Sequence, residues 1–101
     1  AFPGNYGDCE DYVLLKRRQL MAKGVSGHNL LITVVRQQNG DGHAVLTVRT
    51  DRGDFVLDNL ESSIRLWTRT PYRFLKRQSV DGPADWVSIN DGRAPMVGSV
   101  N

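Results

Sequence analysis

Hydrophobic and polar residues follow a helical period at the start of the chain. About one third of a helical wheel holds the main apolar side chains of this segment, Cys9, Tyr12, Val13 and Leu20. Residues 8–23 are therefore predicted to form a helix, with Asp8 as its N-cap and Gly24 as its stop. Leu14 and Met21 fall on a second side, so we expect the helix to be covered on more than one face.

After residue 24 the pattern changes to short β-branched runs separated by turn residues, which is typical of antiparallel strands. Strands are predicted at residues 30–38, 43–50, 55–60, 72–79 and 86–89, with residues 61–67 as a polar link. The whole predicts an α+β fold, in which one helix packs on an antiparallel sheet of about five strands. We expect residues 1–90 to form a single domain and residues 91–101 a flexible tail.

Composition narrows the possible functions. The 101 residues carry 13 basic and 11 acidic side chains, well mixed along the chain, so we expect no nucleic-acid partner. No apolar run approaches the ~18 residues of a membrane span, so we expect no membrane insertion. A single cysteine excludes an internal disulfide framework.

That cysteine lies at the predicted start of the helix. Unpaired N–H groups and the helix dipole favour a thiolate at such a position. The neighbouring acids Asp8, Glu10 and Asp11 oppose a second negative charge, so an active thiolate here would need an imidazolium or a bound cation beside it. The three acids suit calcium in ligand type, but on composition alone an ordinary acidic first turn explains them more readily.

The spacing of His43 and Asp58 offers a partner for Cys9. If Asp51 and Arg52 form a two-residue turn, Asp58 lies opposite residue 45 and becomes a same-face diagonal neighbour of His43. A three-residue loop would put the two on opposite faces. The first register permits a nucleophile, a base and an orienting acid. From spacing alone, an inert buried Cys9 fits the sequence as well.

The remaining candidates favour structural roles. His28 lies in a polar loop and is expected to be exposed, and the cysteine and histidines lack the spacing of a zinc site. Four aromatic residues fall at strand ends and in the polar link: Trp67, Tyr72, Phe74 and Trp86. Core and edge packing explains their positions more readily than a role in binding substrate.

Four stretches carry a resemblance to a known family. They are GDCEDYVLLKR at 7–17, LLITVVR at 30–36, GHAVLTVRTDRGDFVLDNL at 42–60 and TPYRFLKRQS at 70–79. Together they resemble the bacterial transglutaminase-like cysteine peptidases, which include the LapG-like periplasmic proteases. The resemblance implies a papain-like, transglutaminase-type fold. It also implies roles for six residues: Cys9 as nucleophile, His43 as base, Asp58 as orienting acid, and Asp8, Glu10 and Asp11 as calcium ligands.

The same resemblance implies a biological setting. It points to a calcium-dependent periplasmic hydrolase that acts on a protein substrate such as a large surface adhesin, with a role in biofilm control and a regulatory inner-membrane protein as a further partner. Because the family pattern has helical sequence before the cysteine motif, we expect this chain to lack part of the substrate cleft and to be inactive by itself. Transglutaminase-type acyl transfer and a non-catalytic polypeptide-binding module are the alternatives.

Overall fold

A computed structural model gives the arrangement of residues 7–89, apart from the side chains of residues 62 and 83. One long helix begins the described part, and six strands follow it: α1 (Gly7–Ala22), β1 (Leu30–Arg36), β2 (Gly42–Thr50), β3 (Gly53–Asp58), β4 (Glu61–Leu66), β5 (Arg73–Ser79) and β6 (Gly82–Ser88). Two single-turn 3-10 helices, η1 (Gly27–Asn29) and η2 (Trp67–Arg69), lie in the connections. The predicted tail at residues 91–101 lies outside the described residues.

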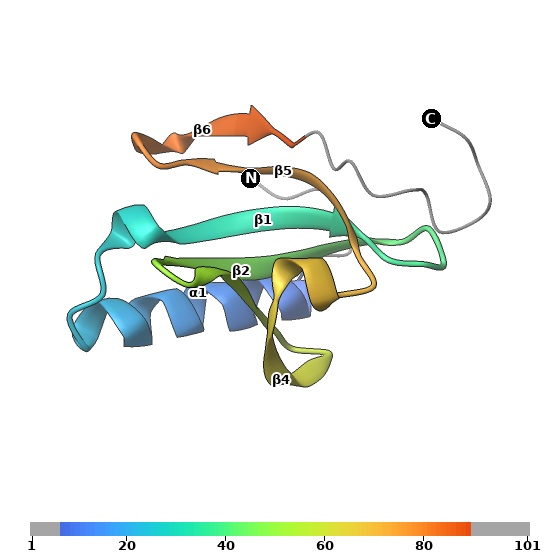
Figure 1. The fold of residues 1–101 in the computed structure, drawn as a ribbon, viewed down its shortest axis with the longest axis horizontal. Coiled ribbons are helices and arrows are strands. Elements are labelled where there is room, and N and C mark those ends of the chain that lie inside the picture. Colours follow the sequence, from blue (N-terminus) through green and yellow to red (C-terminus); the bar gives the residue numbers. More distant parts are fainter. Residues whose placement is uncertain (1–6, 90–101) are drawn as a thin grey trace.

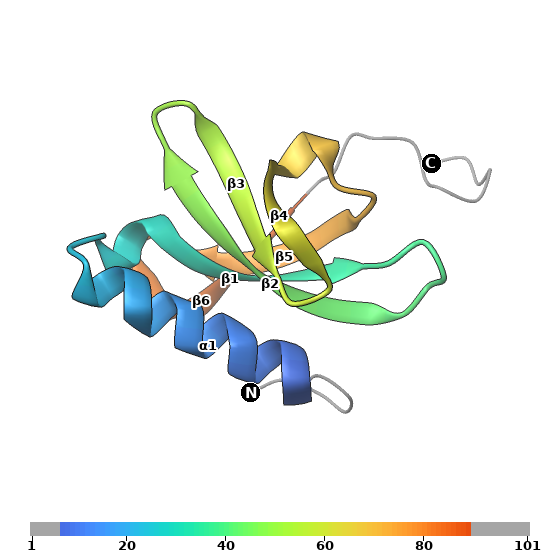
Figure 2. The same ribbon diagram turned by 90° about the horizontal axis from the view of Figure 1, so that it is seen from below.

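The six strands form one antiparallel sheet in the order β4-β3-β2-β1-β5-β6. Figures 1 and 2 show α1 running alongside β1 and β2 on one face of this sheet. The predicted α+β fold, with the cysteine-bearing helix packed on an antiparallel sheet, is therefore confirmed. Gly24 also ends the helix as predicted, because it has a φ of 99°, which a glycine adopts without strain.

The sheet has one strand more than predicted. Residues 61–67 were expected to be a polar link, but Glu61–Leu66 forms β4, which pairs with β3 at the edge of the sheet. An edge strand has no strand beyond it, so it needs few apolar residues. The polar sequence of residues 61–66 therefore gives no strand signal. The last strand also begins at Gly82 rather than residue 86.

Hydrophobic side chains form two cores, one on each side of the sheet. On the helix side, Val13 packs with Leu30, Ile32 and Leu46. The other side holds the second cluster, Val35, Val45, Val56, Tyr72 and Phe74. Leu14 and Met21 are 40% and 44% exposed, so the expectation that α1 is covered on a second face was wrong for this structure.

The turn between β2 and β3 sets the register of the site. Thr50 pairs with Gly53, which leaves a two-residue loop, and Leu46 pairs with Leu57 further along. This is the register predicted from the Asp51-Arg52 turn. Gly53 has a φ of 115°, a conformation that other L-residues rarely adopt, so the tight turn depends on glycine here.

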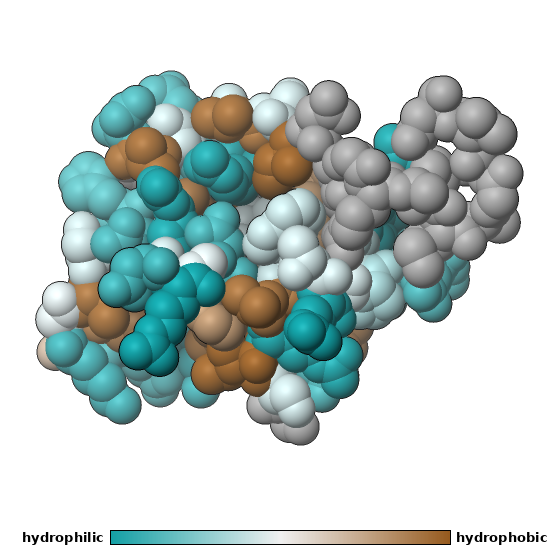
Figure 3. All heavy atoms as spheres, viewed as in Figure 1, coloured by the Kyte–Doolittle hydropathy of each residue, from teal (hydrophilic) through white to brown (hydrophobic). Residues whose placement is uncertain are grey.

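The surface shown in Figure 3 carries hydrophobic residues in separate small groups between hydrophilic ones. Within the part of the chain that the structure describes, no helix has the length and apolar content needed to cross a membrane.

Candidate active site

His43 and Asp58 meet at the open end of the β2–β3 hairpin. The ladder pairs Leu46 with Leu57, and Asp58 comes directly after that last pair. There the His43 Nε2 atom lies 2.7 Å from Asp58 Oδ1, and each residue is only 4% exposed. An ionised carboxylate can only accept hydrogen bonds, so Nε2 carries the proton and Nδ1 is the basic nitrogen of the neutral ring.

Three donors converge on the Asp58 carboxylate. Oδ1 accepts from His43 Nε2 and, at 2.9 Å, from the backbone N–H of Leu60, while Oδ2 accepts from the hydroxyl of Tyr72. Burial by itself raises the pKa of Asp58, but the hydrogen bonds from His43, Tyr72 and Leu60 outweigh it. The pKa of Asp58 is therefore lowered below its usual value, which keeps the buried carboxylate ionised.

Tyr72 was predicted to be a packing residue, and it is one, because it lies in the second core. Its bond to Asp58 was not predicted. The one signal available in the sequence was general: a buried tyrosine hydroxyl usually finds a hydrogen-bond partner. Spacing along the chain gave no indication that the partner was Asp58.

Cys9 lies in the first turn of α1 and is 7% exposed. The structure brings His43 and Asp58 into direct contact and places Cys9 on the helix that packs against β2 and β3. Tyr12 follows Cys9 by three positions and so shares its side of the helix. The pKa of Tyr12 is raised, first by burial and then by the negative charge of Asp58, so this end of α1 lies within the field of the pair. Contact between Cys9 and His43 stays a prediction.

The face of the sheet on which His43 lies limits where Cys9 could contact it. Val35 pairs with His43, and paired residues share a face, so His43 faces the second core. Val13 of α1 packs on the opposite face. The predicted contact between Cys9 and His43 would therefore have to form at the end of the strands, where the β2–β3 ladder has stopped, rather than across the face of the sheet.

The predicted calcium ligands do not form a ready site. Asp8 and Asp11 are exposed and Glu10 is half-buried. Asp8 and Asp11 are three positions apart and share a side of the helix, whereas Glu10 points in another direction, because successive helical positions turn by about 100°. Among the described residues, no group of three or more His, Cys, Asp or Glu side chains is arranged to hold a metal ion. No catalytic step is therefore assigned to calcium.

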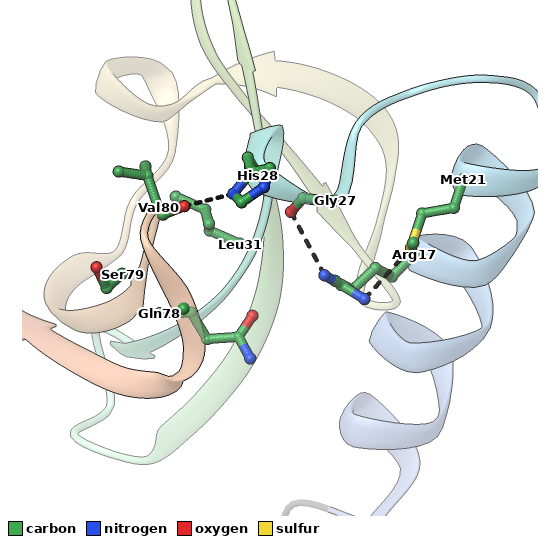
Figure 4. Close-up of a pocket in the computed structure, with 9 residues that line it drawn as sticks. Arg17, Met21, Gly27, His28, Leu31, Gln78, Ser79 and Val80 are labelled. Carbon is green, nitrogen blue, oxygen red and sulfur yellow. Dashed lines mark hydrogen bonds between the residues drawn. The ribbon is translucent and has the colours of Figure 1, made fainter.

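Two cavities are lined by residues considered as candidates. A small one of about 100 Å³ is bordered by Asp58, Tyr72, Glu61 and Arg65, among others. A larger one of about 260 Å³ lies between the second half of α1 and the β5–β6 hairpin, with Arg17 and His28 at its edge (Figure 4). His28 is exposed, as predicted, and its Nδ1 lies 2.6 Å from the carbonyl oxygen of Val80.

A buried His–Asp pair on an antiparallel sheet, beside a helix that begins with a cysteine, is typical of thiol hydrolases of the papain-like kind. Comparison with protein families agrees, because the model of the bacterial transglutaminase-like cysteine proteinases (BTLCP) matches residues 1–94. The chain belongs to this family, as the resemblance predicted. No curated protein and no solved structure gives a significant match.

Proposed function

We propose that this domain is the catalytic part of a peptidase that uses Cys9 as nucleophile, His43 as base and Asp58 as orienting acid. His43 Nδ1 takes the proton of the Cys9 thiol, and the sulfur attacks the carbonyl carbon of a peptide bond. The C–N bond breaks as the imidazolium returns the proton to the leaving amine, which leaves a thioester on Cys9. His43 then removes a proton from water, the hydroxide displaces the sulfur, and the acid product and free thiol are released.

The observation that carries this proposal is the buried hydrogen bond between His43 and Asp58. Its acceptor is an ionised carboxylate, so it stabilises the imidazolium that each proton transfer creates. It also directs Nδ1, the nitrogen required for proton transfer, away from Asp58. Family membership supports the assignment of Cys9 as the nucleophile that this nitrogen serves.

The start of α1 supports a role in charge stabilisation as well. The first N–H groups of a helix have no partner within the helix, and they project outward from its N-terminal end. We propose that the backbone N–H of Cys9 donates to the oxyanion that forms when the sulfur adds to the carbonyl.

For the biological role, we propose a protein substrate cut in the periplasm, with a large surface adhesin as the leading candidate, a link to biofilm control and an inner-membrane protein as regulator. These proposals rest on the resemblance of the sequence to the LapG-like proteases. Mass spectrometry of the surface proteins released by wild-type cells, compared with cells that carry Cys9→Ala, tests them. Release of the same proteins from both would refute the adhesin proposal.

Calcium binding at Asp8, Glu10 and Asp11 also stays a proposal, supported by ligand chemistry and by the resemblance. Calorimetric titration of the full-length protein with Ca²⁺ tests it, with Asp8→Asn and Glu10→Gln as variants. We expect saturable binding that both variants weaken. Equal binding by the wild type and the variants, or no binding at all, would refute this site.

The peptidase proposal is tested by cleavage of protein substrates with the full-length enzyme. We expect Cys9→Ala and His43→Ala each to lower kcat/KM by about 10³-fold or more. His28→Ala is the matched control, because it removes the other histidine, which lies in η1 and contacts the carbonyl oxygen of Val80 rather than Asp58. Cleavage that persists in Cys9→Ala would refute the mechanism. Stable incorporation of an added amine, without cleavage, would favour transglutaminase-type acyl transfer instead.

A further inference from the structure

Tyr72 lies just before β5, and two strands, β2 and β1, lie between β5 and the strand β3 that ends at Asp58. The order β3-β2-β1-β5 separates them, and neighbouring strands lie about 4.8 Å apart, so a flat sheet would hold the two backbones roughly 14 Å apart. The Tyr72 hydroxyl nevertheless donates to Asp58 Oδ2. Tyr72 belongs to the connection between η2 and β5, and residues 70–72 of this connection line the same small cavity as Asp58. The bond therefore ties this connection to the end of β3, which is not a neighbour of β5 in the sheet.

This bond determines the orientation of the carboxylate. The terminal torsion of an aspartate is broad, so His43 and Leu60, which both donate to Oδ1, leave the position of Oδ2 open. Tyr72 occupies Oδ2 and fixes it. With a donor on each oxygen, the plane of the carboxylate is set and Oδ1 stays directed at His43.

The ring of Tyr72 also contacts the histidine. The centroids of the Tyr72 and His43 rings are 5.5 Å apart and the rings are tilted by 58°. Tyr72 is 8% exposed, so its hydroxyl has little access to water as an alternative partner. Burial, followed by the hydrogen bond to Asp58, raises the pKa of Tyr72 well above its usual value, so the hydroxyl remains a donor throughout the physiological range.

We propose that Tyr72 is a positioning residue of the peptidase: its hydroxyl fixes the Asp58 carboxylate, and its ring holds the His43 imidazole, in the orientation that directs Nδ1 at the nucleophile. The inference rests on the proposed function, because it assigns Tyr72 a role in the same proton transfers. It adds a fourth residue to the triad, one that acts through Asp58 and His43 and does not touch the substrate.

The test compares Tyr72→Phe with Phe74→Leu in the full-length protein. Tyr72→Phe keeps the ring and removes only the hydroxyl, whereas Phe74→Leu alters the same core without touching the carboxylate. We expect Tyr72→Phe to lower kcat by about tenfold or more with little change in KM, since a hydrogen bond to a charged group is lost. The acid limb of its pH–rate profile should move to higher pH, and Phe74→Leu should leave the limb in place.

A second measurement does not depend on activity. NMR titration of the Asp58 carboxyl carbon should show a higher pKa in Tyr72→Phe than in the wild type, because one of the bonds that lower it is lost. If Tyr72→Phe does not fold, tyrosinate absorbance in Asp58→Asn replaces it, and the pKa of Tyr72 should then fall toward its usual value.

The titrations and the kinetics test the role of Tyr72 separately from the proposed peptidase function. An unchanged Asp58 titration in Tyr72→Phe, or an unchanged Tyr72 titration in Asp58→Asn, would overturn the inference whether or not the protein cleaves anything. A shifted titration with wild-type kcat would also overturn it, because the bond would then have no catalytic consequence. A wild-type protein without Cys9-dependent cleavage would refute the proposed function, and the catalytic role of Tyr72 with it.

Discussion

The substitution Asp58→Asn separates the charge of the buried carboxylate from its shape. Asparagine can place its oxygen where Oδ1 lies and keep the bonds from His43 and Leu60. Its NH2 group then faces Tyr72, whose hydroxyl can turn and accept. Every buried polar group retains a partner in this arrangement, so we expect the variant to fold.

The expected loss of stability follows from the three bonds. A hydrogen bond to a charged group contributes about 1.5–3 kcal/mol, compared with about 0.5–1.5 kcal/mol for a neutral one, so three bonds lose about 3 kcal/mol together. Burying an amide rather than a carboxylate recovers part of this. We therefore expect Asp58→Asn to lower the free energy of unfolding by about 1–2 kcal/mol near neutral pH.

The stability difference between wild type and Asp58→Asn should depend on pH. The folded pKa of Asp58 is lowered below the unfolded value of about 3.9. The stability that the ionised carboxylate contributes is therefore present in full above that value, and it is lost as the pH falls through the folded pKa. The difference between wild type and Asp58→Asn should narrow as the pH falls below about 4.

Urea unfolding followed by tryptophan fluorescence, at neutral pH and at about pH 3, measures both quantities. The matched control is Asp51→Asn, which removes an exposed acid from the β2–β3 turn and should change stability by less than about 0.5 kcal/mol. If the stability difference for Asp58→Asn were as large at the lower pH as at the higher, or absent at both, the account of the carboxylate would be wrong.

Three further predictions concern the fold and its titration. Leu46→Ala should cost about 2–5 kcal/mol in chemical unfolding, because Leu46 is fully buried under α1, whereas Leu60→Ala, at a 60% exposed position, should cost less than about 1 kcal/mol; equal costs would contradict the described core. Gly53→Ala should cost about 1–3 kcal/mol, since alanine at a φ of 115° is strained and its Cβ would lie 3.0 Å from Leu66, and a stability equal to wild type would argue against this turn. Tyrosinate absorbance at about pH 11 should be the same in Tyr72→Phe as in the wild type, because the raised pKa keeps Tyr72 protonated there; a clear decrease in the variant would show that Tyr72 titrates normally.

Sequence reasoning worked best where one local rule decided the outcome. The Asp51-Arg52 turn fixed the β2–β3 register, and that register put His43 and Asp58 on one face, as the structure shows. Gly24 ended the helix for an equally local reason, its positive φ.

The features that the sequence does not predict lie at the edge of the sheet and in a connection outside its strands. The polar sequence of β4 predicts a link rather than a strand, because an edge strand needs few apolar residues. The Tyr72–Asp58 bond joins the connection before β5 to the end of β3, which is not a neighbour of β5, so no pairing rule could predict it. The side of the sheet on which α1 packs likewise follows from the three-dimensional fold, and no local pattern in the sequence indicates it.

As the proposed nucleophile, Cys9 should carry the acyl group during cleavage. The most direct measurement is the intact mass of the full-length enzyme quenched in acid while it turns over a protein substrate, with peptide mapping of any adduct. We expect an acyl thioester on Cys9 in the wild type, and neither adduct nor cleavage in Cys9→Ala. An acyl group on any other residue, or cleavage by Cys9→Ala at the wild-type rate, would contradict it.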